Sequence, residues 1–257
     1  MFTPLVHSPA ELLESIAMVN TRLYGQLLAQ GRPEHELELI RRAYDLASFL
    51  YAGAHQPDGR PFTAHAVSVA SALTLLGLPS SMVAAALVHN VYNNGDFGDG
   101  LHDALTPARR HLVAEAVGEE IEGYVVRFRS LRLNREIESW GDVERNLMIL
   151  ELADKLDKYV DMNLLFAGDA EWVKRFMNAH EAELVDIAGR LGQPVLAGAL
   201  TLAVARAEKR GSVPTVLRSE PHRKYAYRIQ PASLTLRPKL ALKGQSVTWP
   251  VATTLPP

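Results

Sequence analysis

Residues 80–92 are apolar on nearly every side of a helix, and no other feature of the sequence constrains the fold as strongly. The segment SSMVAAALVHNVY carries no polar face ahead of His89, so it predicts a helix that is buried all round. The chain on both sides also follows helical spacing, and no strand-like alternation of apolar and polar residues occurs before residue 211. The sequence therefore predicts an all-α domain over residues 1–210.

Prolines and glycines divide this domain into separate helices. Ser8, Pro9 and Glu11 predict the start of the first helix. Gly31 and Pro33 predict its end. Loops are expected where glycine and proline cluster, at HQPDGRPF (55–62) and NNGDFGDG (93–100). Further helices are expected near residues 34–54, 63–77, 80–92, 107–117, 119–129, from Ser139 or Asp142 to 165, 169–190 and 193–210.

Residues 211–257 differ in composition from the rest of the chain. They hold seven of the 15 prolines, and seven Lys and Arg against one Glu, which leaves residues 1–210 with 20 basic and 28 acidic residues. We expect this basic extension to pack on the acidic helical domain or on a second copy of it, partly as short edge strands. An arm that binds phosphate or nucleic acid is the alternative. The apolar anchors available for packing are Tyr225, Tyr227, Ile229, Leu234, Leu236, Leu240 and Trp249.

Composition and charge exclude several classes of protein. The chain has no cysteine, which excludes a disulfide scaffold, a thiolate zinc site and a cysteine nucleophile. The net charge of −2 argues against a general nucleic-acid-binding protein, which needs a concentrated basic face. The N-terminus lacks the basic-then-apolar pattern of a signal peptide, and no run of 18 apolar residues could span a membrane. We therefore expect a soluble, cytoplasmic protein without a membrane partner.

Polar residues interrupt three of the predicted apolar helices. His65 lies near the start of one predicted helix, His89 and Asn90 close the apolar one, and Asp154 lies within LMILELADKLDKYV. A buried imidazole or carboxylate is costly unless it has a partner. Two imidazoles and a carboxylate around a divalent ion would satisfy all of these groups at once. The sequence therefore predicts a metal site that includes His65, His89 and Asp154.

The same residues lie in motifs with a characteristic order. Residues 59–65 read GRPFTAH, 76–78 read LGL, 85–90 read AALVHN and 146–159 read NLMILELADKLDKY, with a step of 24 residues from His65 to His89. Over about residues 35–165, this set resembles the RelA/SpoT-type HD-domain hydrolases, which break down guanosine tetraphosphate. The resemblance implies an HD-type helical fold. It also implies a manganese or similar divalent ion held by His65, His89, the residue at position 90 and Asp154.

The resemblance fails at the positions that carry the family's chemistry. Asn90 stands where the family has the Asp of a His-Asp pair, so the site loses one negative charge and its metal affinity should fall. Asn93 and Asn94 stand where the family has a Glu-Asp pair that positions or activates the attacking water. An amide cannot take up a proton at neutral pH, so neither residue can be a general base. Asn93 and Asn94 remain the candidate catalytic positions.

The substrate-binding positions differ as well. Gln56 replaces an Arg that stacks on guanine in the family, and Pro57 replaces a Lys. Asp58 stands in place of a Ser and Lys158 in place of an Asn. We therefore do not expect efficient hydrolysis of guanosine tetraphosphate. The candidate substrate-binding residues are Gln56, Arg60, Lys155 and Lys158.

Other groups offer alternatives to these assignments. His102 and Asp103 form a second His-Asp pair, but they follow a loop, so Asp103 is expected to cap the next helix or to lie at the surface. Asp96 and Asp99 could replace the missing carboxylates from that same loop. His55 could line the cleft or lie in solvent.

The sequence leaves two main classes of function open. The first is a metal-dependent phosphohydrolase that acts on a nucleotide or another small phosphorylated compound, with manganese as the favoured ion. The second is a catalytically inactive HD-fold protein that binds a ligand or a partner and needs no metal. The amides at Asn90, Asn93 and Asn94 favour this second class. A different reaction on the same metal-binding residues is a third hypothesis, and a homo-oligomer is compatible with all three.

Overall fold

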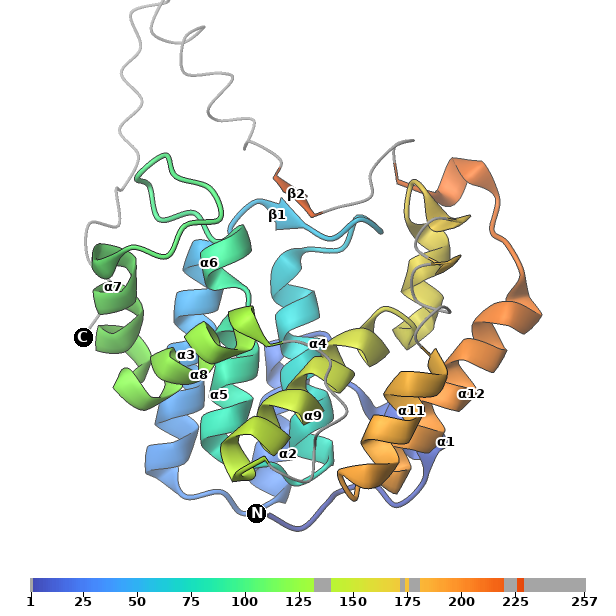
Figure 1. The fold of residues 1–257 in the computed structure, drawn as a ribbon, viewed down its shortest axis with the longest axis horizontal. Helices are drawn as coiled ribbons and strands as arrows, with labels where there is room; N and C mark the ends of the chain where they lie inside the picture. Colours follow the sequence, from blue (N-terminus) through green and yellow to red (C-terminus); the bar gives the residue numbers. More distant parts are fainter. Residues whose placement is uncertain (1, 132–139, 172–173, 176–180, 220–225, 229–257) are drawn as a thin grey trace, which may run out of the picture.

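A computed structural model describes residues 2–131, 140–171, 174–175, 181–219 and 226–228. These residues are predominantly helical, and two short strands form their only sheet (Figure 1). The predicted all-α class is therefore confirmed. Among the described helices, none is long and apolar enough to cross a membrane.

The elements follow the predicted order along the chain. They are α1 (Pro9–Ser15), α2 (Asn20–Ala29), α3 (Glu34–Leu50), β1 (Ala54–His55), α4 (Phe62–Leu75), α5 (Ser80–Val88), α6 (Val91–Asn94), α7 (Pro107–Val117), α8 (Glu119–Ser130), α9 (Asp142–Asp157), the 3-10 helix η2 (Val160–Phe166), α11 (Glu181–Arg190), α12 (Pro194–Arg210), the 3-10 helix η3 (Thr215–Leu217) and β2 (Tyr227–Arg228). The C-terminal part of the helix predicted over residues 169–190 is α11.

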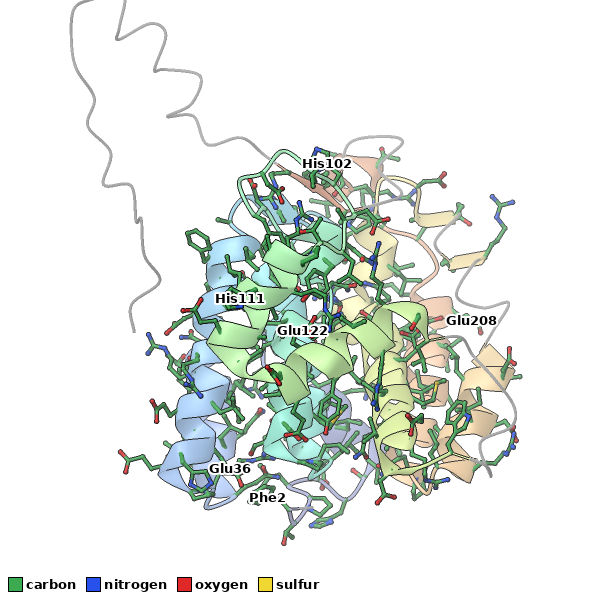
Figure 2. The ribbon with its side chains drawn as sticks, turned by 60° about the vertical axis from the view of Figure 1, so that its left-hand side comes forward. Phe2, Glu36, His102, His111, Glu122 and Glu208 are labelled. Atoms are coloured by element: carbon green, nitrogen blue, oxygen red, sulfur yellow. The ribbon has the colours of Figure 1, made fainter. Side chains whose placement is uncertain are left out.

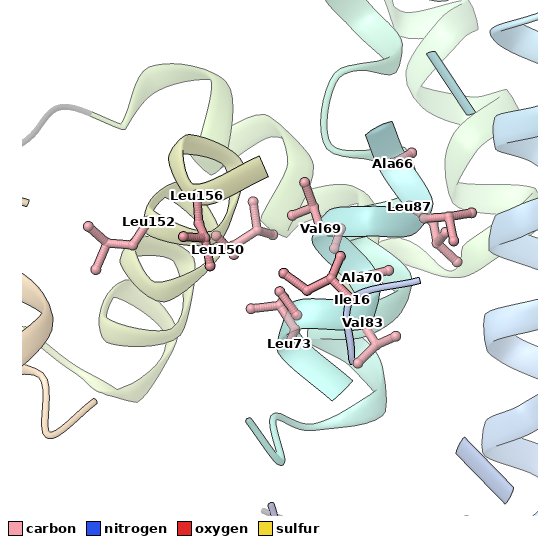
Figure 3. Packing of buried hydrophobic residues seen from close by; sticks show 14 of the residues in the cluster. Ile16, Ala66, Val69, Ala70, Leu73, Val83, Leu87, Leu150, Leu152 and Leu156 are labelled. Carbon is pink, nitrogen blue, oxygen red and sulfur yellow. The ribbon is translucent and has the colours of Figure 1, made fainter. Parts of the chain in front are cut away.

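Helix α5 lies at the centre of the fold, as its apolar sequence predicts. Its residues from Met82 to Val88 are all buried. It packs against α3, α4, α8 and α9, and Figure 1 shows it between α3 on one side and α4 and α9 on the other. In the close-up of the core, Val69 and Leu73 of α4 lie between the leucines of α9 and Val83 of α5 (Figure 3).

Gly77 of the LGL motif ends α4 and makes room for the N-terminal segment. Its φ of 78° is left-handed, which favours glycine. Its carbonyl accepts a hydrogen bond from the backbone N–H of Phe2 at 2.8 Å, and an added Cβ would collide with the backbone carbonyl of Phe2. The motif therefore fixes a turn and a close backbone approach, and it contributes no polar side chain to a site.

Two local predictions need correction. The first predicted helix is two helices, because Ile16 leaves the helical conformation and the N–H of Ala17 donates instead to Ser71 Oγ on α4 at 2.8 Å. The long helix predicted to reach residue 165 ends at Asp157, and the left-handed residues Asp161 and Met162 break the chain that follows.

Asp103 takes the second of the two positions expected for it. Its side chain lies at the surface, and the cap of α7 is Thr106, whose hydroxyl accepts from Arg109 N–H.

The chain also contains a strand ahead of residue 211, where none was predicted. Residues Ala54–His55 pair antiparallel with Tyr227–Arg228, at the end of the molecule where α4 begins. A two-residue strand is too short to show alternation. The predicted short strands of the C-terminal extension, and its packing on the helical domain, are confirmed for Tyr227, whose ring stacks on His55 at a centroid distance of 5.4 Å. The remaining predicted anchors lie outside the described residues.

Leu87 tests whether burial of α5 stabilises the fold. Its side chain is fully buried in α5, whereas Leu28 in α2 is 65% exposed. Leu87→Ala should lower the free energy of unfolding by about 2–5 kcal/mol, because it removes buried methyl groups and leaves a cavity. Leu28→Ala should change it by less than about 0.5 kcal/mol. Urea unfolding of both variants gives the comparison, and equal losses would contradict the central position of α5.

A buried carboxylate joins α6, α7 and α8. Glu122 on α8 (Figure 2) accepts hydrogen bonds from Arg110 at 2.7 Å and from Tyr92 Oη at 2.8 Å. The hydrogen bonds from Arg110 lower the pKa of Glu122 below its ordinary value of 4.5. The charged form of Glu122 is therefore favoured in the folded state.

This depressed pKa predicts a pH dependence. Glu122 stabilises the fold above its unfolded pKa, and the stabilisation is lost as the pH falls through the lower, folded pKa. Glu122→Gln should therefore lower the stability at pH 7 and flatten the fall in stability between about pH 5 and pH 3. Urea unfolding across that range measures both effects. Glu115→Gln, at an exposed position of α7, is the control and should keep the wild-type slope.

Candidate metal centre

Three predicted ligands from three helices meet in the buried interior. His65 lies in the first turn of α4, which begins after Pro61; His89 directly follows the last residue of α5; and Asp154 lies in the last turn of α9. All three are buried, and one ligand atom from each lies within 4.8 Å of the others. The structure therefore brings together the two imidazoles and the carboxylate that the sequence singled out.

The ligand atoms face one another at short range. His65 Nε2 lies 3.2 Å from Asp154 Oδ1, and His89 Nε2 lies 3.5 Å from the same oxygen. Ligand atoms about 2 Å from a shared ion are roughly 3 Å apart when they are adjacent. Among the described residues, His65 Nε2 and Asp154 Oδ1 are buried and make no hydrogen bond.

The partner of Nδ1 in each imidazole indicates which nitrogen of the ring faces the centre. His65 Nδ1 lies 2.7 Å from Asp157 Oδ2, and His89 Nδ1 lies 2.6 Å from the carbonyl oxygen of Ala86. Both partners are acceptors, so each Nδ1 carries a proton. The Nε2 atom of each ring therefore faces Asp154 Oδ1. In the neutral tautomer with the proton on Nδ1, an imidazole can offer its Nε2 lone pair to a cation at the place where Asp154 offers a carboxylate oxygen.

Asp154 stays ionised despite its burial. Burial alone would raise the pKa of its carboxyl group, but the charges of Lys158 and Lys155 hold that pKa well below its usual range. Lys155 Nζ lies 2.8 Å from Glu151 and 3.5 Å from Asp154. The site therefore offers a charged carboxylate at neutral pH, which is the form that binds a divalent ion.

Asp157 orients His65 from behind. Besides accepting from His65, its two carboxylate oxygens accept from Arg60 Nη1 at 3.0 Å and Nη2 at 2.8 Å. Arg60 Nε in turn donates to Asp58 at 2.8 Å. Burial would raise the pKa of Asp157, but the charge of Arg60 and the contact with His65 lower it. A carboxylate behind a ligating histidine sets its tautomer and strengthens it as a ligand.

Asn90, the proposed weak fourth ligand, lies beside His89. Its side-chain amide nitrogen is 2.7 Å from His89 Nε2, and its backbone N–H donates to Tyr51 Oη at 3.2 Å. In this orientation the amide donates to the imidazole. The same amide turned through 180° would present its oxygen instead. Asn90 as a metal ligand therefore stays a prediction.

Two of the predicted substrate-binding residues contact each other beside the centre, and the other two bind acidic residues. Lys158 Nζ donates to Gln56 Oε1 at 3.2 Å, which joins two of them across the loop before α4. Arg60 is held by Asp58 and Asp157, and Lys155 by Glu151. All four lie on the loop before α4 or near the end of α9, the two elements that carry His65 and Asp154. Their binding roles stay predictions.

Asn93 and Asn94 lie on α6 and face a different space. They line a pocket of about 280 Å³ together with His102, Tyr227 and Arg228. Asn93 is exposed, and His102 lies at the edge of the molecule (Figure 2). The lining of this pocket contains none of the residues His65, His89 and Asp154. Their catalytic role stays a prediction, and the structure adds β2 as a wall of their pocket.

The other acidic groups of the 93–103 loop are engaged by arginines. Asp99 binds Arg109 at 2.5 Å, which lowers the pKa of Asp99 to about 2. Asp103 pairs with Arg129 at 2.9 Å, and Asp96 lies 3.9 Å from Arg228. Within the described residues, none of them joins the metal-binding group. They hold the loop in place and leave Asp154 as the only carboxylate in that group.

Sequence reasoning missed several residues that shape the site. Asp157 has the clearest signal, because it follows Asp154 by three residues and so shares its helix face. No such signal indicates the aromatic rings that pack around the imidazoles. Phe62 lies edge-on to His65 at a centroid distance of 5.0 Å, and Phe128 lies edge-on to His89 at 5.3 Å. Phe128 reaches the centre from α8, and sequence spacing does not predict such a contact.

The sequence matches a family model over one part of the chain. Residues 49–132 match a domain of unknown function, DUF6817. The match includes His65, His89 and Asn90 and stops short of Asp154. It therefore covers two of the three residues that meet in the candidate centre.

Curated proteins with similar sequences include (p)ppGpp synthase/hydrolases and probable GTP pyrophosphokinases. The bifunctional (p)ppGpp synthase/hydrolase RelA of Mycobacterium tuberculosis is 29% identical over 79 residues, which cover 31% of this chain and 10% of that protein. The bifunctional (p)ppGpp synthase/hydrolase SpoT of Escherichia coli is 26% identical over 134 residues, covering 51% and 17%. A probable GTP pyrophosphokinase of Mycobacterium leprae is 24% identical over 162 residues, covering 60% and 19%. The chain is thus weakly similar to less than a fifth of each RelA/SpoT relative.

Substitutions of Arg60 and Asp157 should have strongly coupled effects on the free energy of unfolding. Their side chains are 13% and 1% exposed. Asp157→Leu alone should lower the free energy of unfolding by about 3–5 kcal/mol, because it leaves the Arg60 charge without its bidentate partner. The double variant Arg60→Met with Asp157→Leu should lose less than the two single variants together. Urea unfolding of all four proteins measures the coupling, and additive losses would contradict it.

Proposed function

We propose that the chain is a metal-dependent phosphohydrolase of the HD type, acting on a nucleotide or another small phosphorylated compound, with manganese as the favoured ion. A cytoplasmic location and an HD domain over residues 1–210, with residues 211–257 as an extension, belong to the same proposal. The observation that carries it is the buried set of His65 Nε2, His89 Nε2 and Asp154 Oδ1, which lie within 4.8 Å of one another. The partial similarity to RelA/SpoT enzymes supports the phosphate chemistry.

The residues of the chain have distinct tasks in this proposal. His65, His89 and Asp154 hold the ion, and Asp157 keeps His65 in the tautomer that ligates. A divalent ion in such a site supplies Lewis acidity toward a phosphoryl oxygen and lowers the pKa of water. Lys158 and Lys155, whose charges act on Asp154, also favour an anionic substrate beside the ion.

The substrate is not expected to be bound as the RelA/SpoT hydrolases bind theirs. Gln56 donates or accepts hydrogen bonds but carries no charge, and it is already in contact with Lys158. Asn93 and Asn94 can orient a water but cannot take its proton. These two positions therefore offer no general base, so slow turnover of guanosine tetraphosphate fits this site better than efficient turnover.

One observation favours a second candidate function, an inactive protein that binds a ligand. The Asn90 amide donates to His89 Nε2, and this hydrogen bond satisfies the imidazole without an ion. In that case His89 and Asn90 are a structural pair, and the pocket beside α6 binds a regulatory ligand.

Metal binding separates the two candidates. After treatment with a chelator, the full chain should bind one manganese ion by isothermal titration calorimetry, and Asp154→Ala should lose detectable binding because it removes the charged ligand. Asp186→Ala, at an exposed site of α11, is the control and should bind as the wild type. Phosphate release from a panel of nucleotides should require the ion and be lost in Asp154→Ala. A folded wild-type protein that binds no divalent ion would favour the inactive candidate.

Asn90→Asp tests the fourth ligand position. If the side chain turns toward the ion, the added carboxylate should tighten manganese binding by roughly tenfold, which corresponds to about 1.4 kcal/mol. Asn93→Asp adds the same charge at an exposed position of α6 and should change the affinity little. Calorimetry with both variants gives the answer, and equal or weaker binding by Asn90→Asp would show that residue 90 does not face the ion.

A further inference from the structure

A larger cavity lies away from the metal centre, between α1, α2, η2 and α12. Its volume is about 660 Å³, which is within the range of about 300–1,000 Å³ typical of small-molecule sites. Its lining contains none of the residues His65, His89 and Asp154. Figure 1 shows α1 and α12 side by side at the edge of the molecule opposite α7, and this cavity has no role in the proposed hydrolase.

The floor of the cavity is apolar. Ile16, Tyr159, Val160 and Ala203 line it and are buried. Leu13 and the partly buried Met162 continue the apolar lining. A ligand that fits this floor has an apolar body, aromatic or aliphatic, because apolar surface removed from water is the main favourable contribution there.

The rim of the cavity is basic. Its charged residues are Arg22, Arg206, Lys209 and Arg210, against Glu14 and Asp161. Glu14 is engaged by two of the arginines: its carboxylate by Arg206 at 3.3 Å and its backbone carbonyl by Arg22 at 3.1 Å. Arg206, Lys209 and Arg210 lie on one face of α12, and Arg22 adds a fourth positive charge from α2. Such a rim favours an anionic head group.

Unusual backbone lies in the same wall. Asp161 and Met162 have left-handed φ values of 51° and 58° although neither is glycine, and both line the cavity. The turn is held by Met162 N–H donating to Tyr159 O and Leu164 N–H donating to Lys158 O, both at 2.8 Å. Sparsely populated conformations of this kind are strained and cluster at binding sites. The backbone outliers therefore coincide with the cavity that has the basic rim.

From these observations, we propose that the cavity binds a small organic anion: an aromatic or aliphatic body on the Ile16–Ala203 floor and a carboxylate, sulfonate or phosphate at the Arg206–Lys209–Arg210 rim. This second site is independent of the metal centre and of the reaction proposed there. The two sites are close along the sequence, since the η2 segment begins three residues after Asp157.

Three probes that share one body test this site in the full chain. Naphthalene-2-sulfonate should bind by isothermal titration calorimetry, whereas 2-naphthylmethylammonium, with the opposite charge, should not, and 2-naphthol should bind more weakly than the sulfonate. Since a sulfonate is not a substrate for phosphate hydrolysis, this binding measurement does not depend on turnover at the metal centre. Equal binding of the sulfonate and the ammonium compound would overturn the proposal.

Charge reversal locates the binding. Lys209→Glu with Arg210→Glu should weaken sulfonate binding by roughly tenfold or more, because two exposed attractions become repulsions. Arg41→Glu with Arg42→Glu makes the same change of net charge on exposed residues of α3 and should leave binding unchanged. Equal weakening in both double variants would overturn the assignment, since it would report net charge alone. If the first double variant does not fold, Arg22→Glu on α2 makes the same test, with the same two outcomes.

Discussion

The carboxylate of Asp157, shared between an imidazole and a guanidinium, is the interaction on which the candidate centre depends. It accepts from His65 Nδ1 at 2.7 Å and binds both terminal nitrogens of Arg60. A buried carboxylate is tolerated only with such partners. The contacts join the end of α9 to the start of α4 and to the loop before it. The orientation of His65 and the packing of two helices therefore depend on one charged group.

The residues of the centre could largely be predicted from the sequence, because they interrupt apolar helices. His65, His89 and Asp154 are conspicuous only because their neighbours are buried side chains, and α5 is conspicuous because it has no polar face at all. Local pattern carries this information, since a helix places residues on faces by their spacing alone. The start of α1 could also be predicted from local spacing. Ser8 and Glu11 stand three residues apart, and the side chain of each accepts from the backbone N–H of the other.

Other features could not be predicted, because they depend on residues far apart in the chain. The break after α1 follows from the hydrogen bond between Ala17 and Ser71, and β1 exists because Tyr227 and Arg228 return to pair with it. The sequence indicates Arg60 only as a candidate substrate-binding residue, whereas the fold pairs it with Asp58 and Asp157. Sequence spacing reports which residues share a helix face and does not report what packs against that face.

The charges around the centre indicate how a bound ion and a phosphorylated ligand would affect each other's binding. The three converging ligands include one carboxylate, and Lys155 and Lys158 act on it from the same end of α9. A set with one carboxylate and two neutral imidazoles binds a divalent ion less tightly than a set with more negative charge. A phosphoryl group that reaches the ion supplies charge that the amide at Asn90 does not, and it also offers the two lysines a second anion. In the proposed function, the ion and the phosphorylated ligand therefore stabilise each other in the site.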